Sequence, residues 1–364
     1  MPETYEFDAV IIGAGIVGLA VAHRLREKFD SILLVEKENS FGKHVSSRNS
    51  EVIHSGIYYE RDSLKAKLCV EGNQKLVQYA QSNNIGHKIC GKLVVVSDTE
   101  ELQQLKTLMI NGMQNGVQGL EIISAAEVKK REPHIHSEGA LWVPSAGIID
   151  SHAVMQKLEY QIKSQNGVVV YNSEVTGIQY KNDNYLVSFN NLDYSAVSPI
   201  VINSAGLWCD KISSMVGITD YQLHICKGEY YKTSLYRHQI NSLIYPLPTD
   251  ISLGLHIVMH LDGTIGFGPN AYYVDEIDYS MDDSNKKEFL TNINKYMDLT
   301  EEALNEDFAG IRPKIQAPGK PQEDFIIKNE IEKGYHNFIN LIGIESPGLT
   351  ASLAIAEYVK DIID

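Results

Sequence analysis

The chain has 364 residues and a formal net charge of −15, which arises from 32 lysines and arginines against 47 aspartates and glutamates. Its hydrophobic content of 43% excludes a disordered chain, and its length suggests about two domains. The acidic excess repels phosphate backbones, so we expect no nucleic acid as a partner. The four cysteines lack C-x-x-C spacing, which predicts free thiols and no metal site.

The longest uncharged apolar run is 9–22, which is shorter than the ~20 residues of a membrane-spanning helix. Acidic residues precede this run, whereas a signal peptide would begin with basic ones. We therefore expect a cytoplasmic protein, with peripheral contact at the inner face of the membrane as the only membrane association.

The first elements form a strand–turn–helix–strand unit. A β-branched apolar stretch at 7–12 predicts a strand, the pattern at 16–28 predicts a helix, and the apolar run at 31–35 predicts a second strand. The turn after the first strand has the pattern G-x-G-x-x-G, at Gly13, Gly15 and Gly18. This order predicts a dinucleotide-binding unit.

Each part of this unit has a physical role. The first glycine makes the tight turn, the second lets the backbone approach a pyrophosphate, and the third allows the helix to pack on the strand. Ile16 and Val17 form the start of the helix, where free backbone N–H groups point at the phosphates. Glu36 ends the second strand, where its carboxylate can accept hydrogen bonds from a ribose. A carboxylate there disfavours the 2′-phosphate of NADP.

The remaining elements alternate between helical and extended patterns. The polar stretch 42–60 predicts an extended functional loop. Helices are expected at 63–83, 100–116, 125–131, from 150–152 onward, at 286–297, 301–306 and 348–363. Strands are expected at 92–96, 167–171, 173–180, 185–190, 200–202, 228–233, 242–245, 253–259, 264–268 and 338–344.

The strands that gather between 221 and 268 suggest an antiparallel sheet, and no linker separates them from the nucleotide-binding unit. We therefore predict an α/β fold in which a Rossmann-like domain is interleaved with a substrate domain built on an antiparallel sheet. The nucleotide-binding domain is expected over 1–85, 145–215 and 322–364. The substrate domain is expected over 86–144 and 216–321.

Two further segments favour FAD over NAD. Polar side chains suited to an extended dinucleotide follow Glu36, at Lys37, Ser46, Ser47, Arg48 and Asn49. A glycine-rich helix start lies at the far end of the chain, at Gly343, Ile344, Glu345, Ser346, Pro347, Gly348, Leu349 and Thr350. Reduced flavin carries negative charge near N1 and the C2 carbonyl, which the positive end of a helix can stabilise.

Several segments resemble one family. They are 46–59 with the motif HSGIYY, 63–69, 227–231, 268–271, 310–314, and 343–350 with the motif IESPGLT. In these the chain is similar to the L-2-hydroxyglutarate dehydrogenase/oxidase family, a branch of the D-amino-acid-oxidase-like FAD-dependent oxidoreductases.

The resemblance implies that the Rossmann-like domain is an FAD-binding domain, with further cofactor contacts at Val175, Ala205 and Gly206. It also implies oxidation of a 2-hydroxy acid to a 2-oxo acid by hydride transfer to flavin N5. Within this class of reactions, the resemblance favours the oxidation of L-2-hydroxyglutarate to 2-oxoglutarate. A quinone or oxygen is the implied electron acceptor.

This chemistry needs a base for the hydroxyl proton and a cation for the substrate carboxylate. Histidine has a suitable pKa near neutrality, and His54 and His256 are the candidates; the sequence does not choose between them. Arg312 resembles the carboxylate-binding arginine of the superfamily, and arginine binds carboxylates through two parallel hydrogen bonds. Further candidates for substrate contacts are Tyr58, Tyr231, Tyr245 and Lys227, and for a second cation Arg48, Lys227 and Lys314.

Three other functions are compatible with parts of this pattern. A flavin-dependent amine or amino-acid oxidase would share the fold and Arg312. A non-catalytic FAD-bearing subunit would need a partner protein. A flavin-free NAD dehydrogenase would use only the first βαβ unit.

Overall fold

A six-stranded sheet forms the centre of the nucleotide-binding part of the fold. The computed structural model describes residues 3–190, 194–248 and 254–363. In this sheet the strand order is β10-β3-β2-β14-β22-β21, and only β21 runs antiparallel to its neighbour. The strands are β2 (Ala9–Ile12), β3 (Ile32–Val35), β10 (Val168–Val170), β14 (Val201–Asn203), β21 (Ile326–Asn329) and β22 (Phe338–Ile342).

Alternate residues of the central strands enter two different cores, because successive side chains of a strand point to opposite faces. Ala9 and Ile11 pack in a core with helices, whereas Val10 and Ile12 pack in a core with a second sheet. The helices of the first core are α1 (Ile16–Leu25), α2 (Leu64–Ser82), α5 (Ser151–Ser164) and α8 (Gly348–Asp361). The other face meets α6 (Cys209–Met215) and the sheet β1 (Glu3–Glu6), β11 (Val175–Lys181), β12 (Asn184–Phe189) and β13 (Tyr194–Ser198).

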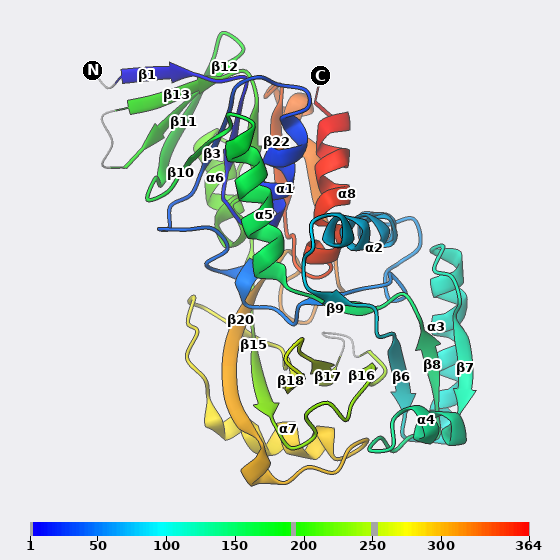
Figure 1. The fold of residues 1–364 in the computed structure, drawn as a ribbon. Helices are drawn as coiled ribbons and strands as arrows, with labels where there is room; N and C mark the ends of the chain where they lie inside the picture. The colour runs from blue at the N-terminus through cyan, green and yellow to red at the C-terminus, as the bar shows by residue number, and fades with distance from the viewer. Residues whose placement is uncertain (1–2, 191–193, 249–253, 364) are drawn as a thin grey trace.

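A nine-stranded sheet forms the other half of the molecule (Figure 1). Its strands pair antiparallel except β16, which runs parallel to β6, so the sheet is mixed rather than purely antiparallel. The strands are β6 (Lys92–Val96), β7 (Glu121–Ser124), β8 (Gly139–Val143), β15 (His224–Thr233), β16 (Leu243–Tyr245), β17 (His256–Met259), β18 (Ile265–Gly268), β19 (Tyr272–Val274) and β20 (Asn305–Lys314).

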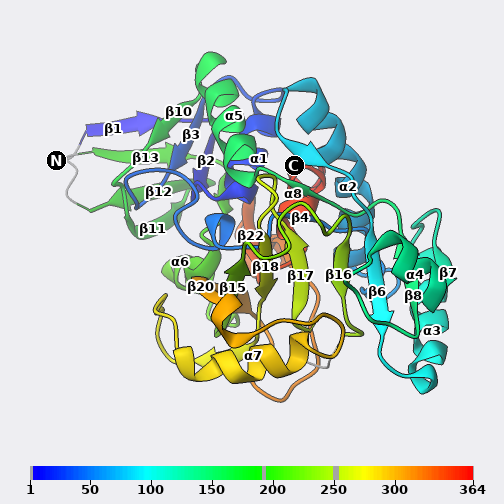
Figure 2. The same ribbon diagram turned by 60° about the horizontal axis from the view of Figure 1, so that its bottom comes forward.

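Smaller elements flank this sheet. Figure 2 shows α7 across its outer side, and α3 and α4 beside the edge strand β7 and its neighbour β8. A short three-stranded sheet packs near α2. The helices are α3 (Leu102–Gln114), α4 (Ala125–Arg131) and α7 (Lys286–Ile293), and the short strands are β4 (Val52–Ile53), β5 (His87–Lys88) and β9 (Gly147–Ile149).

Helices from the first and last parts of the chain lie side by side. Helix α1, near the N-terminus, packs against α8, near the C-terminus (Figure 1). Helix α2 crosses α8 so closely that a Cβ on Gly72 would lie 2.4 Å from the carbonyl oxygen of Thr350. This packing brings the glycine turn and the start of α8 to the same region of the molecule.

Some sequence predictions of elements were wrong. The interval 301–306 was expected to be helical, but only a 3₁₀ turn at Glu301–Ala303 precedes β20. The pairing of β20 with β15 along ten residues overrides the local helical pattern. Helix α6 was not predicted as a helix. In the predicted strand 253–259, Leu253 lies outside the described residues, and β17 begins at His256. No helix of the described ranges is long and apolar enough to cross a bilayer.

Candidate active site

A cavity of about 530 Å³ lies between the six-stranded and nine-stranded sheets. Its lining joins the predicted cofactor segments to the predicted catalytic residues. The predicted residues that line it are Gly13, Gly15, Ile16, Val17, Glu36, Lys37, Ser46, Arg48, Asn49, His54, Tyr58, Val175, Ala205, Gly206, Tyr245, His256, Arg312, Lys314, Ile344, Glu345, Ser346, Pro347, Gly348 and Leu349.

At one end of the cavity, the glycine turn leaves no room for side chains. Gly13 has φ +100°, and a Cβ there would lie 2.6 Å from the carbonyl oxygen of Ser204. A Cβ on Gly18 would lie 1.9 Å from the carbonyl oxygen of Gly13, which explains why Gly18 supports the turn without lining the cavity. The backbone N–H of Ala14 donates to the Glu36 carboxylate at 2.8 Å. This geometry matches the dinucleotide-binding turn expected from the sequence.

Substituting alanine at Gly18 should disrupt this turn. We expect Gly18→Ala to lower the free energy of unfolding by about 1–3 kcal/mol, since the added methyl group overpacks a backbone contact. Purified protein should also retain less FAD. Gly177→Ala is the control, because a Cβ on Gly177 would meet nothing within 4 Å. Thermal unfolding and FAD content measure both effects, and equal values for the two variants would contradict the prediction.

The start of α8 closes the cavity against the segment that carries His54. The backbone N–H of His54 donates to the Thr350 hydroxyl at 2.9 Å, and Thr350 donates to the Val52 carbonyl oxygen at 3.2 Å. Ser346 lies 3.2 Å from Nε2 of His54. Thr350 therefore links the two segments without lining the cavity. Gly343 and Ser47 also do not line it.

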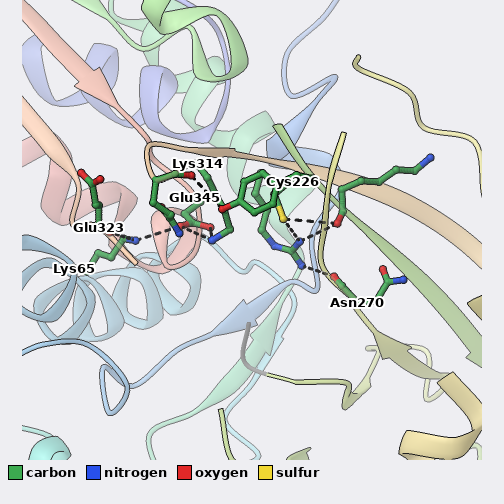
Figure 3. Close-up of polar contacts among 10 residues, drawn as sticks. Lys65, Cys226, Asn270, Lys314, Glu323 and Glu345 are labelled. Atoms are coloured by element: carbon green, nitrogen blue, oxygen red, sulfur yellow. Dashed lines mark hydrogen bonds and ion pairs between the residues drawn. The ribbon is translucent and has the colours of Figure 1, made fainter. Parts of the chain in front are cut away.

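A buried charge cluster lies beside the start of α8 (Figure 3). The Glu345 carboxylate is 3.3 Å from the Lys65 ammonium and 3.1 Å from the Lys314 ammonium, and all three side chains are at most 5% exposed. Lys65 also donates to the carbonyl oxygen of Glu323 at 2.7 Å. Burial opposes ionisation of Glu345, but the two lysines hold the pKa of its carboxyl below the usual value. The cluster of Lys65, Glu345 and Lys314 thus carries one excess positive charge.

Neutralising Glu345 should destabilise the fold. Glu345→Gln leaves two buried ammonium groups without a carboxylate, and we expect a loss of about 3–5 kcal/mol in the free energy of unfolding. The control is Glu332→Gln, which breaks the exposed pair between Glu332 and Lys328 and should cost less than about 1 kcal/mol. Urea unfolding at neutral pH measures both. Similar losses for both variants would contradict the prediction.

Arg312 presents an uncompensated charge to the cavity. Its guanidinium donates to the carbonyl oxygens of Asn270 at 3.2 Å and Lys227 at 3.4 Å, and it lies near the Cys226 sulfur (Figure 3). Gly228 leaves room for it, since a Cβ there would lie 2.7 Å from Nη2. Arg312 forms no ion pair with a carboxylate among the described residues. A cavity cation without a counterion is suited to binding an anion.

His256 has a free ring nitrogen in the cavity wall. Its Nδ1 lies 3.0 Å from the carbonyl oxygen of Gly254, so Nδ1 carries the proton and donates it, leaving Nε2 as an acceptor. Nε2 has no hydrogen-bond partner within the described ranges. Burial is the main cause that lowers the pKa of His256 to about 3, and the nearby charges of Lys92 and Arg312 lower it further. The hydrogen bond to Gly254 raises this pKa but does not offset the other effects. His256 is therefore neutral at physiological pH.

His54 is also neutral, but its surroundings differ. Burial, followed by the charge of Lys92, lowers its pKa well below the usual value. Its Nε2 already contacts Ser346, whereas its buried Nδ1 has no partner in the described part of the chain. Each histidine therefore has one buried ring nitrogen, Nδ1 of His54 and Nε2 of His256, without a hydrogen-bond partner among the described residues.

Two predicted substrate contacts do not line the cavity, and we correct them. Tyr231 is fully buried in the core, where its ring packs 4.7 Å from that of Phe289. The Lys227 ammonium pairs with Asp278 at 3.0 Å. Strand alternation explains both positions, because Gly228 and Tyr230 of β15 face the cavity and their neighbours face away. The sequence alone does not distinguish Tyr230 from Tyr231, because a shift of one residue in strand register decides which of the two faces the cavity.

The residues present fit a flavin dinucleotide. The glycine turn and Glu36 form a cradle at one end of the cavity, where added Cβ atoms would clash with the backbone. The start of α8 and the excess positive charge beside Glu345 lie at another part of the same cavity. A helix N-terminus and a buried cation both favour the negative charge of a reduced flavin.

Comparisons with known proteins agree with this geometry. The model of the FAD dependent oxidoreductase family matches residues 8–362. The mitochondrial L-2-hydroxyglutarate dehydrogenase of Arabidopsis thaliana is 34% identical, over 97% of this chain and 83% of that protein. L-2-hydroxyglutarate dehydrogenase of Indibacter alkaliphilus is 30% identical, over 96% of this chain and 97% of its own length.

Solved structures show the same fold. L-alpha-glycerophosphate oxidase from Mycoplasma pneumoniae with FAD bound has a TM-score of 0.88 and 25% identity, covering 99% of this chain and 95% of that one. Glycine oxidase from Geobacillus kaustophilus has a TM-score of 0.83 and 17% identity, covering 98% and 94%, and is a likeness of fold alone.

Proposed function

This chain belongs to the FAD-dependent oxidoreductase family that includes the L-2-hydroxyglutarate dehydrogenases, and we propose that it oxidises L-2-hydroxyglutarate to 2-oxoglutarate. In this reaction C2 of the substrate loses a hydride and its hydroxyl group loses a proton, which forms the carbonyl. When bound, FAD would supply the acceptor for this hydride. Gly13, Gly15, Glu36 and the start of α8 at Gly348 would hold the cofactor.

The observation that carries the proposal is the uncompensated Arg312 guanidinium in the same cavity as a neutral His256. Arg312 binds the C1 carboxylate through two parallel hydrogen bonds, which fixes the orientation of C2. Every 2-hydroxy acid brings such a carboxylate. The position of Arg312 in β20, held by carbonyl oxygens instead of carboxylates, leaves its charge available for the substrate.

His256 takes the hydroxyl proton. Its Nε2 has no hydrogen-bond partner among the residues that the structure describes, and the bond from Nδ1 to Gly254 fixes the tautomer in which Nε2 can accept a proton. A general base must be unprotonated before the reaction, and the lowered pKa of His256 keeps it unprotonated at physiological pH. The buried ring of Tyr245 and the partly buried ring of Tyr58 line the cavity and keep water away from the reacting atoms.

The test is anaerobic reduction of the purified holoprotein by a panel of substrates, followed as the loss of flavin absorbance. We expect rapid bleaching by L-2-hydroxyglutarate and slow or no bleaching by L-glutamate, glycine or L-proline. Bleaching by an amino acid but by no hydroxy acid would assign the chain to the amine oxidases, and no bleaching at all would favour a non-catalytic subunit. The electron acceptor, a quinone or oxygen, stays a prediction, as do the cytoplasmic location and the peripheral membrane contact.

A further inference from the structure

Lys92 is a buried lysine that the proposed reaction has not yet used, and burial lowers the pKa of its amine to about 7. It lies in β6, its side chain is fully buried, and its ammonium has no hydrogen-bond partner and no ion pair within the described residues. Cys69 and Cys90 are its ionisable neighbours, and burial raises the pKa of both thiols, so neither is a counter-anion at neutral pH. Without a counterion, the charged form of Lys92 is costly in this site, and an anion bound nearby would stabilise that charged form.

The groups around Lys92 line one wall of the cavity. Its ammonium lies 3.9 Å from the ring centre of Tyr245 and 5.1 Å from that of Tyr58. The Tyr245 ring in turn stacks on His256, with ring centres 4.0 Å apart and planes at 7°. Lys92, Tyr245 and His256 come from neighbouring strands, since β6 pairs with β16 and β16 pairs with β17. Lys92 therefore stands directly behind the wall formed by Tyr245.

The same wall holds unused hydrogen-bond donors. The hydroxyl groups of Tyr58 and Tyr245 are both buried and have no partner among the described residues. Burial raises the pKa of both phenols, so both remain protonated and able to donate. Two donors backed by a cation form a site for an anion that enters from the cavity.

We propose that Lys92, together with the Tyr58 and Tyr245 hydroxyls, forms the subsite for the distal carboxylate of a dicarboxylate substrate. The inference rests on the proposed function, in which Arg312 binds the C1 carboxylate. The hydroxyls donate to the distal carboxylate directly. Lys92 compensates its charge from behind the Tyr245 ring, and so acts as a specificity residue that does not touch the reacting atoms.

The position of His256 supports two separate carboxylate sites. The charges of both Lys92 and Arg312 act on His256, which lies within electrostatic reach of each. Lys92 and Arg312 come from different strands, β6 and β20. A substrate with a carboxylate at each end can thus satisfy both cations while its hydroxyl lies near His256. A monocarboxylate would leave Lys92 uncompensated.

The experiment measures binding of unreactive analogues to the holoprotein by titration calorimetry. The probes are glutarate, with two carboxylates, and butyrate, with one. We expect Lys92→Met to weaken glutarate binding about 10- to 100-fold and butyrate binding less than about 3-fold. Lys88→Met is the matched control, because Lys88 is exposed, its ammonium lies 3.7 Å from the Met259 sulfur, and it does not line the cavity. It should leave both affinities unchanged.

A second variant covers the case in which Lys92→Met does not fold. Tyr58→Phe removes one donor and keeps the ring, and it should weaken glutarate binding more than butyrate binding. Equal losses for the two probes, or no loss in either variant, would overturn the subsite. These outcomes would leave the proposed function intact as long as L-2-hydroxyglutarate bleaches the wild-type flavin. If it does not, the proposed function itself fails.

Discussion

Arg312→Ala should lower kcat/KM for L-2-hydroxyglutarate about a thousandfold. The carbonyl oxygens of Asn270 and Lys227 hold the guanidinium that binds the C1 carboxylate. Alanine removes the positive charge and the two hydrogen bonds that the guanidinium donates to this carboxylate. Losing one partner of a buried charge pair typically costs about 2–5 kcal/mol, which corresponds to this range of rates. The variant should contain as much FAD as the wild-type protein, because the glycine turn and α8 are unchanged.

Arg312→Lys separates charge from geometry. Lysine keeps the positive charge but cannot form two parallel hydrogen bonds, so we expect recovery of only part of the loss. Arg237→Lys is the control, since Arg237 is exposed and donates to the carbonyl oxygen of Asp262. Stopped-flow flavin reduction across substrate concentrations measures all three variants. Full activity in Arg312→Ala would refute the assignment of this residue to the carboxylate.

His256→Gln should slow flavin reduction about 100- to 10,000-fold, the usual contribution of a general base. Glutarate binding should change little, since the carboxylate sites are separate from His256. His54→Gln is the informative comparison: Nε2 of His54 already contacts Ser346, so its loss should cost less. A larger effect at His54 than at His256 would reverse the assignment of the base.

The pH dependence gives an independent check on His256. Its pKa is lowered to about 3, so the base is neutral throughout the range of about pH 5 to 8 in which an exposed histidine titrates. Activity requires the unprotonated form, and protonation sets in only as the pH falls toward the lowered pKa. We therefore expect kcat/KM to show no acid limb in that range. An acid limb centred near pH 6.5 would indicate an ordinary histidine as the base.

Local patterns predicted the parts of the fold that depend on neighbouring residues. The predicted helix at 125–131 coincides with α4, and the last helix begins at Gly348 as expected. The roles of Gly13 and Gly18 also followed from spacing, since a dinucleotide turn needs glycine at these positions for steric reasons. The domain boundaries stay a prediction.

Long-range pairing determined the features that the sequence did not reveal. Strand β20 forms because it pairs with β15, which is about 80 residues distant in sequence, and no local pattern signals that contact. The choice between Tyr230 and Tyr231 depends on register, which shifts between these residues where β15 meets β20. Lys92 lies in a predicted strand, but only the assembled sheet places its charge behind Tyr245.

The most direct measurement is a single turnover under anaerobic conditions. Holoprotein is mixed with excess L-2-hydroxyglutarate, and the flavin absorbance and the 2-oxoglutarate formed are both quantified. We expect complete bleaching with one 2-oxoglutarate per flavin, and no comparable reaction with the D enantiomer or with L-glutamate. An oxidised flavin that persists with L-2-hydroxyglutarate but is bleached by L-glutamate would contradict the account.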